Sequence, residues 1–123
     1  MKSFILALAL LWQAFPAHAG DREQLIGMWV ETHPRDHIVH FAEDGSWKLH
    51  LKKNELADYH SLEGTWTISP DGKLRVTLHL NGKTQIFSTR MKFNGEELLL
   101  VDDNGTETRH RRHQGALPER FQW

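Results

Sequence analysis

The sequence predicts an all-β protein, a small eight-stranded antiparallel up-and-down barrel. The first observation is that Asn-Gly pairs occur at 81–82, 94–95 and 104–105, between runs of apolar patterning. Such pairs are the strongest short-range hairpin signal, because both central residues of a type I′ turn need positive φ. The second observation is strict alternation of apolar and polar residues, as in 73–80, which is typical of a strand with one buried face. Short strands joined by tight turns close most naturally into an up-and-down barrel.

Residues 1–19 have the pattern of an export signal, and we predict that they are a signal peptide. Lys2 gives a positive start, residues 4–12 form an apolar run, and Ala17-His18-Ala19 has the small-x-small pattern of a cleavage site. The apolar run is too short to cross a bilayer as a helix, which needs about 20 residues. The expected location of the mature chain is therefore periplasmic or secreted.

We expect residues 20–113 to form one barrel domain and 114–123 a C-terminal tail. A helical turn at 21–26 is expected before the strands. The tail contains Phe121 and Trp123, so it either wraps back onto the barrel or serves as a short partner-binding tag. The eight predicted strands cover 27–33, 37–42, 46–52, 61–68, 73–80, 83–93, 96–103 and 106–112.

The turns also predict the register of the strand pairs. Loops at 43–45, 70–72 and 81–82 place Phe41 opposite Trp47, Ile68 opposite Leu74, and Leu80 opposite Lys83. Two-residue loops at 94–95 and 104–105 place Phe93 opposite Glu96 and Asp103 opposite Thr106, and a loop at 34–36 places His33 opposite His37. A slip of one residue would turn every side chain of a strand to the other face.

Composition excludes several classes of protein. Without Lys2, fourteen Lys and Arg face sixteen Asp and Glu, so the mature chain is slightly acidic, whereas nucleic-acid binders are normally basic. The sequence has no Cys, which excludes disulfides and thiol chemistry. It also lacks Gly-x-Ser-x-Gly, His-Glu-x-x-His and phosphate-loop motifs. We therefore expect a protein that is not an enzyme and uses no cofactor.

The motif Gly27-Met28-Trp29 opens the first predicted strand, and the last strand carries Arg109, Arg111 and Arg112. This pattern resembles the lipocalins, in which the tryptophan of Gly-x-Trp packs against an arginine of the closing strand. A second Gly-Thr-Trp at 64–66 and the Phe-x-x-Asp-Gly at 41–45 are similar to small exported bacterial lipocalin-like (calycin-type) β-barrel proteins. The chain is shorter than typical lipocalins and lacks their disulfide and C-terminal helix. The resemblance implies a non-enzymatic carrier or sensor for a small apolar or amphipathic ligand.

The predicted register turns several polar side chains into the barrel, among them Asp102, Glu107, Arg109 and Arg111. Burying a polar group inside a barrel costs free energy unless the group is paired, so these side chains should have a partner or a function. One interpretation makes Arg109 an anchor for a ligand carboxylate or phosphate. The other is that Arg109 pairs with Glu107 or Asp102. The predicted ligand-binding residues are Glu31, His33, His37, Leu51, Leu80, Gln85, Leu100 and Arg109.

We predict no metal site, and the weak candidates for one are His33 and His37. Placed on facing strands together with Glu31, two imidazoles and a carboxylate could hold Zn or Cu. The alternative is that these histidines lie at the solvated mouth of the barrel. His40 points the opposite way from His37 in a strand, so it does not extend the set.

The alternative function is a protein-interaction module of the envelope, such as a protease inhibitor. In that case Trp29, Trp47 and Trp66 fill the barrel, and a terminus or loop binds the partner. An outer-membrane barrel is excluded because most strands are shorter than the 9–11 residues it needs. Its lipid face would also carry charged residues: Lys48, Lys52, Glu63 and Arg75.

Overall fold

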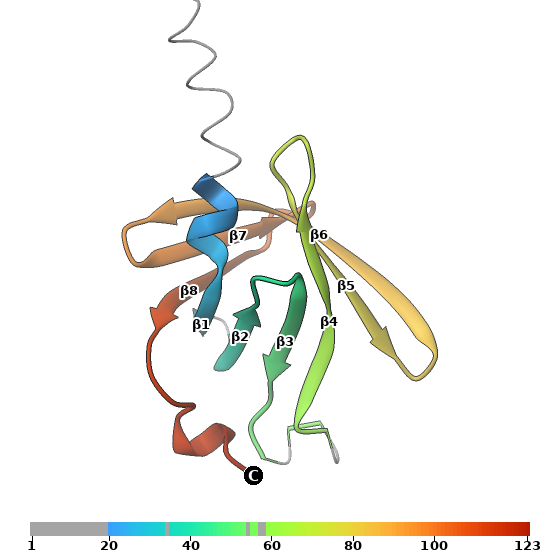
Figure 1. The fold of residues 1–123 in the computed structure, drawn as a ribbon, viewed down its shortest axis with the longest axis vertical. Helices are drawn as coiled ribbons and strands as arrows, with labels where there is room; N and C mark the ends of the chain where they lie inside the picture. Colours follow the sequence, from blue (N-terminus) through green and yellow to red (C-terminus); the bar gives the residue numbers. More distant parts are fainter. Residues whose placement is uncertain (1–19, 34, 54, 57–58) are drawn as a thin grey trace, which may run out of the picture.

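The computed structural model describes residues 20–123, except for 34, 54, 57 and 58. The described residues form eight antiparallel strands that close into a barrel, in which each strand pairs with its neighbours in sequence and β1 pairs with β8 (Figure 1). The predicted fold class is confirmed. The elements are β1 (Gly27–His33), β2 (His37–Phe41), β3 (Ser46–His50), β4 (Ser61–Ile68), β5 (Leu74–Leu80), β6 (Lys83–Asn94), β7 (Glu97–Asp102), β8 (Glu107–His113) and the 3₁₀ turn η1 (Glu119–Phe121).

Three hairpins have the predicted register. Phe41 faces Trp47 in β2–β3, and Ile68 faces Leu74 in β4–β5. Leu80 faces Lys83 across the Asn81-Gly82 turn of β5–β6. In each of these hairpins the turn residues and the apolar alternation specify the same pairing, so a slipped register would expose an apolar face.

The register of β6–β7 differs from the prediction by two residues. Asn94 pairs with Glu97, and Phe93 pairs with Leu98 instead of Glu96. The loop consists of Gly95 and Glu96, so it lies one residue later in the chain than the Asn-Gly pair indicates. Since side chains repeat every two residues along a strand, this shift keeps each of them on its predicted face.

The register of β7–β8 differs by one residue, and this changes which side chains enter the barrel. Leu100 pairs with Thr108, and Leu98 pairs with His110. The loop is a residue longer than predicted because the Asp102 carboxylate Oδ1 accepts hydrogen bonds from the backbone amides of Asn104 and Thr106, both at 2.9 Å. The faces of β8 are therefore exchanged relative to the prediction. Thr108 and His110 face inward, and Glu107, Arg109 and Arg111 face outward.

One end of the barrel is sealed around Trp29, which is fully buried. Residues 20–25 are helical, close to the predicted turn, and the Leu25 carbonyl accepts a hydrogen bond from Trp29 Nε1 at 2.9 Å. The Arg112 guanidinium lies 4.2 Å from the centre of the Trp29 ring and donates to the Ile26 carbonyl at 3.2 Å. The contact between tryptophan and closing arginine that the lipocalin resemblance implies is present, with Arg112 as the arginine.

The second Gly-x-Trp motif makes a parallel arrangement. Trp66 is buried and donates from Nε1 to the Ala42 carbonyl at 2.9 Å. The Arg22 guanidinium lies 4.6 Å from the centre of its ring and donates to the Glu43 carbonyl at 2.7 Å. The residues around both tryptophans form one core cluster, whose buried members are Leu25, Trp29, Val39, Phe41, Trp66, Leu74, Val76 and Leu98.

The C-terminal tail returns along the outside of the barrel. Arg120 forms a bidentate ion pair with Asp36, at 2.7 and 3.0 Å. Trp123 stacks on His60 with 4.0 Å between ring centres, and Phe121 is buried. This is the wrapped arrangement that we considered beside the partner-binding tag. Among the described residues, no helix is both long and apolar enough to cross a membrane.

Candidate functional site

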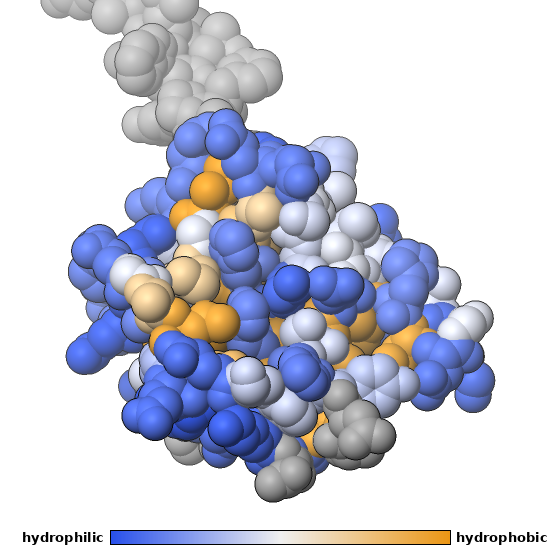
Figure 2. All heavy atoms as spheres, turned by 60° about the horizontal axis from the view of Figure 1, so that its bottom comes forward, coloured by the Kyte–Doolittle hydropathy of each residue, from blue (hydrophilic) through white to orange (hydrophobic). Residues whose placement is uncertain are grey.

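A cavity of about 340 Å³ lies inside the barrel. Its volume falls near the lower end of the range for small-molecule sites, about 300–1,000 Å³. Figure 2 shows hydrophobic residues between hydrophilic ones on the face that includes the lower end of Figure 1. Each of the eight strands contributes to the wall. Ten of the lining side chains are apolar: Val39, Phe41, Trp47, Leu49, Leu62, Leu74, Val76, Leu78, Phe87 and Leu100.

The cavity is not fully enclosed on the β5–β6 side. Phe87 lines the cavity and is nevertheless 48% exposed, and its neighbour Ile86 is also exposed. In Figure 1 the β5–β6 hairpin extends beyond the rest of the barrel. A ligand that entered on this side would contact Phe87.

Five polar side chains complete the wall, and the register explains why three of them lie together. Glu31 pairs with His37 on β2 and with His110 on β8. The three residues therefore form one row across adjacent strands. The prediction had placed His37 opposite His33, but the connection after Glu31 is longer than three residues. The other two polar members are Thr89 and Thr108.

Hydrogen bonds orient two members of this row. His37 Nε2 is hydrogen-bonded to the Glu55 carboxylate, which comes from the connection between β3 and β4. Glu31 Oε2 accepts the backbone amide of Arg35 at 3.0 Å. The other carboxylate oxygen of Glu31, Oε1, lies 3.9 Å from His110 Nε2, which is too long for a hydrogen bond.

Burial changes the proton affinity of two of these groups in opposite directions. Loss of hydration raises the pKa of the Glu31 carboxyl group above its usual value. It lowers the pKa of His110 to about 4, so the imidazole is neutral near pH 7. His110 Nδ1 and Thr89 Oγ1 are buried, and neither has a hydrogen-bond partner among the described residues. The cavity wall thus contains one acidic group, Glu31, and two residues with a buried polar atom that has no hydrogen-bond partner among the described residues.

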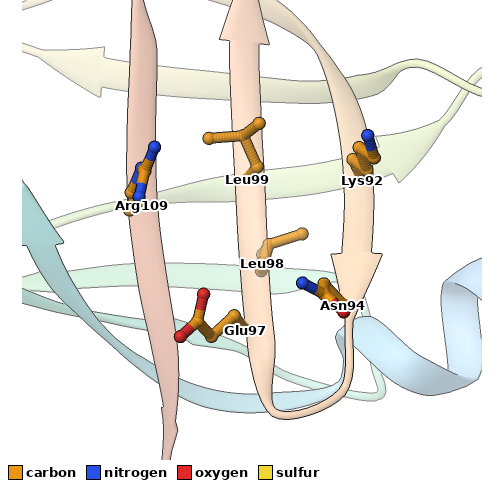
Figure 3. A pocket seen from close by; sticks show the side chains of 6 residues that line it. All are labelled: Lys92, Asn94, Glu97, Leu98, Leu99 and Arg109. Atoms are coloured by element: carbon orange, nitrogen blue, oxygen red, sulfur yellow. The ribbon is translucent and has the colours of Figure 1, made fainter.

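Three of the predicted site residues line this cavity: Glu31, His37 and Leu100. Arg109 does not, because the longer β7–β8 loop turns it outward. It lines a hollow of about 190 Å³ on the outer surface of β6–β8, where Leu99 lies between Arg109 and Lys92 (Figure 3). The predicted anchoring of a carboxylate by Arg109 inside the barrel is therefore wrong.

The remaining predicted site residues lie away from the cavity wall. Leu51 is buried beyond the end of β3, where its carbonyl accepts a hydrogen bond from Trp123 Nε1 at 3.1 Å. Leu80 and Gln85 belong to the end of the β5–β6 hairpin, where Gln85 is exposed. The backbone of His33 pairs with Arg109, and the His33 side chain is outside the described part of the structure.

Sequence reasoning missed His110 and Thr108 because both depend on one extra residue in the β7–β8 loop. The signal that could have revealed it is Asp102, whose carboxylate can accept the amides of a longer turn. In the described ranges, no group of three or more His, Asp or Glu side chains is arranged to hold a metal ion.

No protein-family model, curated protein or solved structure gives a significant match to this chain. The cavity is therefore the feature of this chain that indicates a function.

Proposed function

We propose that this chain is a non-enzymatic binding protein that carries a small apolar or amphipathic molecule inside its barrel. The supporting observation is the cavity of about 340 Å³, which has an apolar wall and a row of polar groups on one side. Such a combination is characteristic of ligand sites, in which apolar area gives affinity and a few polar groups fix orientation. The small volume favours a ligand smaller than those of full-sized carriers.

The alternative, a protein-interaction module, requires a filled barrel and an exposed apolar patch at the tail. The barrel is hollow, and Phe121 is 3% exposed. The filled barrel is therefore not found in the described residues, and of the apolar tail residues only Trp123, which is 43% exposed, is available to a partner. The contact of Arg112 with Trp29 supports a lipocalin-like relationship, and the pattern of residues 1–19 supports a periplasmic or secreted location.

A fluorescence titration with N-phenyl-1-naphthylamine, a neutral apolar probe, tests the proposal. We expect saturable binding of one probe per chain, with quenching of Trp47, which lines the cavity. The variant Thr89→Phe should abolish binding, because the larger ring fills the cavity and the lost hydroxyl makes no hydrogen bond to the residues that the structure describes. Arg109→Met is the matched control, since this side chain lies outside the barrel.

Two results would overturn the proposal. One is the absence of saturable binding to the folded wild-type chain. The other is unchanged binding by a folded Thr89→Phe variant, which would place the probe on the outer surface. If Thr89→Phe fails to fold, Leu100→Phe at the same cavity wall serves instead. Native mass spectrometry of protein purified from its own cells would then identify the natural ligand by its mass.

A further inference from the structure

Glu31 gives the cavity a charge that restricts which ligands it accepts. The side chain is 12% exposed and forms part of the cavity wall. One of its oxygens accepts the Arg35 amide, whereas Oε1 is too far from His110 Nε2 for a hydrogen bond. A buried carboxylate is costly unless a positive charge or several donors stabilise it.

The wall of the cavity does not supply this positive charge. The described residues that line it include no Lys or Arg, and the nearby charges of Arg35 and His37 lower the pKa of Glu31 by less than burial raises it. Arg111 faces outward, 3.7 Å from Glu97, and His37 is hydrogen-bonded to Glu55 instead of Glu31. A ligand carboxylate would therefore place a second negative charge beside Glu31 in a medium of low dielectric constant, where repulsion is strong.

The other polar atoms of the cavity favour a ligand that donates hydrogen bonds. His110 is 5% exposed and lines the cavity, and its Nδ1 has no hydrogen-bond partner among the described residues. As a neutral imidazole it offers one acceptor nitrogen, and the Thr89 hydroxyl offers another acceptor. An ammonium group carries three donors and no acceptor, so it complements this set together with Glu31.

The aromatic part of the wall suits the same kind of ligand. Phe41, Trp47 and Phe87 line the cavity with apolar side chains. Aromatic faces accommodate both alkyl groups and cations, because the ring face is electron-rich. From these observations we infer that the cavity selects a cationic amphiphile, an apolar amine whose ammonium group pairs with Glu31. This inference rests on the proposed function and specifies the ligand class.

A series of ligands with one alkyl chain and different head groups tests the inference. Decylamine, decanol and decanoate are compared at pH 7 by displacement of N-phenyl-1-naphthylamine. We expect decylamine to bind about tenfold more tightly than decanol, and decanoate to bind most weakly. In Glu31→Gln, the advantage of decylamine should disappear, whereas the affinity for decanol should stay within about twofold. Glu107→Gln is the control, since Glu107 is an exposed carboxylate on the outer face of β8.

The possible outcomes separate this inference from the proposed function. Equal affinity for decylamine and decanol, or tighter binding of decanoate, would overturn the inference and leave the apolar cavity intact as a binding site. The same conclusion follows if Glu31→Gln retains the full preference for decylamine. Failure of all three compounds and of the probe to bind would overturn the proposed function as well.

Discussion

Arg112 joins two parts of the chain that are far apart in sequence. Its guanidinium donates to the carbonyls of Gln24 and Ile26, which precede it by 88 and 86 residues, and it covers the Trp29 ring. A cation over a desolvated tryptophan and charge-assisted hydrogen bonds each contribute about 2 kcal/mol. A single side chain therefore fixes the N-terminal helical turn to the closing strand.

We predict that Arg112→Met lowers the free energy of unfolding by roughly 3 kcal/mol, because it removes these contacts and leaves two carbonyls without donors. Urea denaturation followed by tryptophan fluorescence measures the change. Arg111→Met is the control. The exposed Arg111 guanidinium Nη2 lies 3.7 Å from Glu97 Oε1, so removing this ion pair should lower the free energy of unfolding by less than about 0.5 kcal/mol. Equal effects of the two substitutions would contradict the role of Arg112.

His110 should make the protein sensitive to acid. The unfolded chain takes up a proton on this residue near pH 6.5, whereas burial lowers the pKa in the folded state to about 4. Stability is therefore unaffected above pH 6.5 and decreases as the pH falls toward 4, by about 3 kcal/mol in total from this group. The raised pKa of Glu31 acts in the opposite direction and offsets part of the loss.

The variant His110→Gln should show a smaller loss of stability between pH 7 and pH 4.5, since an amide does not titrate. Urea midpoints at the two pH values give the comparison. His79→Gln is a suitable control, because His79 is exposed. If His110→Gln and the wild type lose the same stability on acidification, other groups determine the acid response.

The candidate site could be predicted from the sequence only in part, and individual residues show why. Alternation along β1 and β2 places Glu31 and His37 inward whatever the exact turn lengths. The faces on which Arg109 and His110 lie depend instead on the length of the β7–β8 loop. The Asp102 carboxylate determines this length by accepting hydrogen bonds from two backbone amides. Glu55 reaches His37 from a long connection that has no repeating pattern, so sequence alone could not place it.

Among the secondary-structure elements, β4 and β5 leave no room for a side chain at Gly64. A Cβ atom at this position would lie 2.0 Å from the Thr77 carbonyl oxygen, which belongs to the backbone of β5. This contact explains why Gly64 interrupts the apolar face of β4 opposite Leu78. Glycine in a strand commonly marks such a close approach.

We predict that Gly64→Ala costs about 3 kcal/mol or more, because the β5 backbone must move to accept the methyl group. Thermal or urea unfolding measures the loss. Thr65→Ala, at the exposed neighbouring position, should change stability by less than about 1 kcal/mol. A mild effect of Gly64→Ala would mean that the two strands can separate at this point without loss of pairing.

The hairpins were predictable where turn chemistry and alternation agree, as in β5–β6. In β6–β7 the loop begins at Gly95, and the register differs from the predicted one by two residues. Each side chain of these strands is nevertheless on the face that was predicted. The tail could not be placed from sequence. Its position depends on partners without a local signature, such as the ion pair of Arg120 with Asp36, 84 residues away.

At the scale of the whole molecule, the barrel wall is also the wall of the binding cavity, because all eight strands contribute lining residues. Ligand binding should therefore stabilise the entire fold. We predict that a ligand at one hundred times its dissociation constant raises the free energy of unfolding by about 2.7 kcal/mol. Urea denaturation with and without N-phenyl-1-naphthylamine checks this prediction. Thr89→Phe should show no such increase, and stabilisation of that variant would indicate binding elsewhere.

The barrel is closed by the pairing of β1 with β8, which joins opposite ends of the domain, while the other described pairs are between consecutive strands. Forming a contact across so long a loop carries a large entropic cost, so we expect this pairing to form last during folding. Until then β1 and β8 are free sheet edges, which are prone to join other chains and aggregate. Positive charge discourages such association. The basic residues Arg109, Arg111 and Arg112 should therefore limit pairing of β8 with other chains before β1 pairs with it.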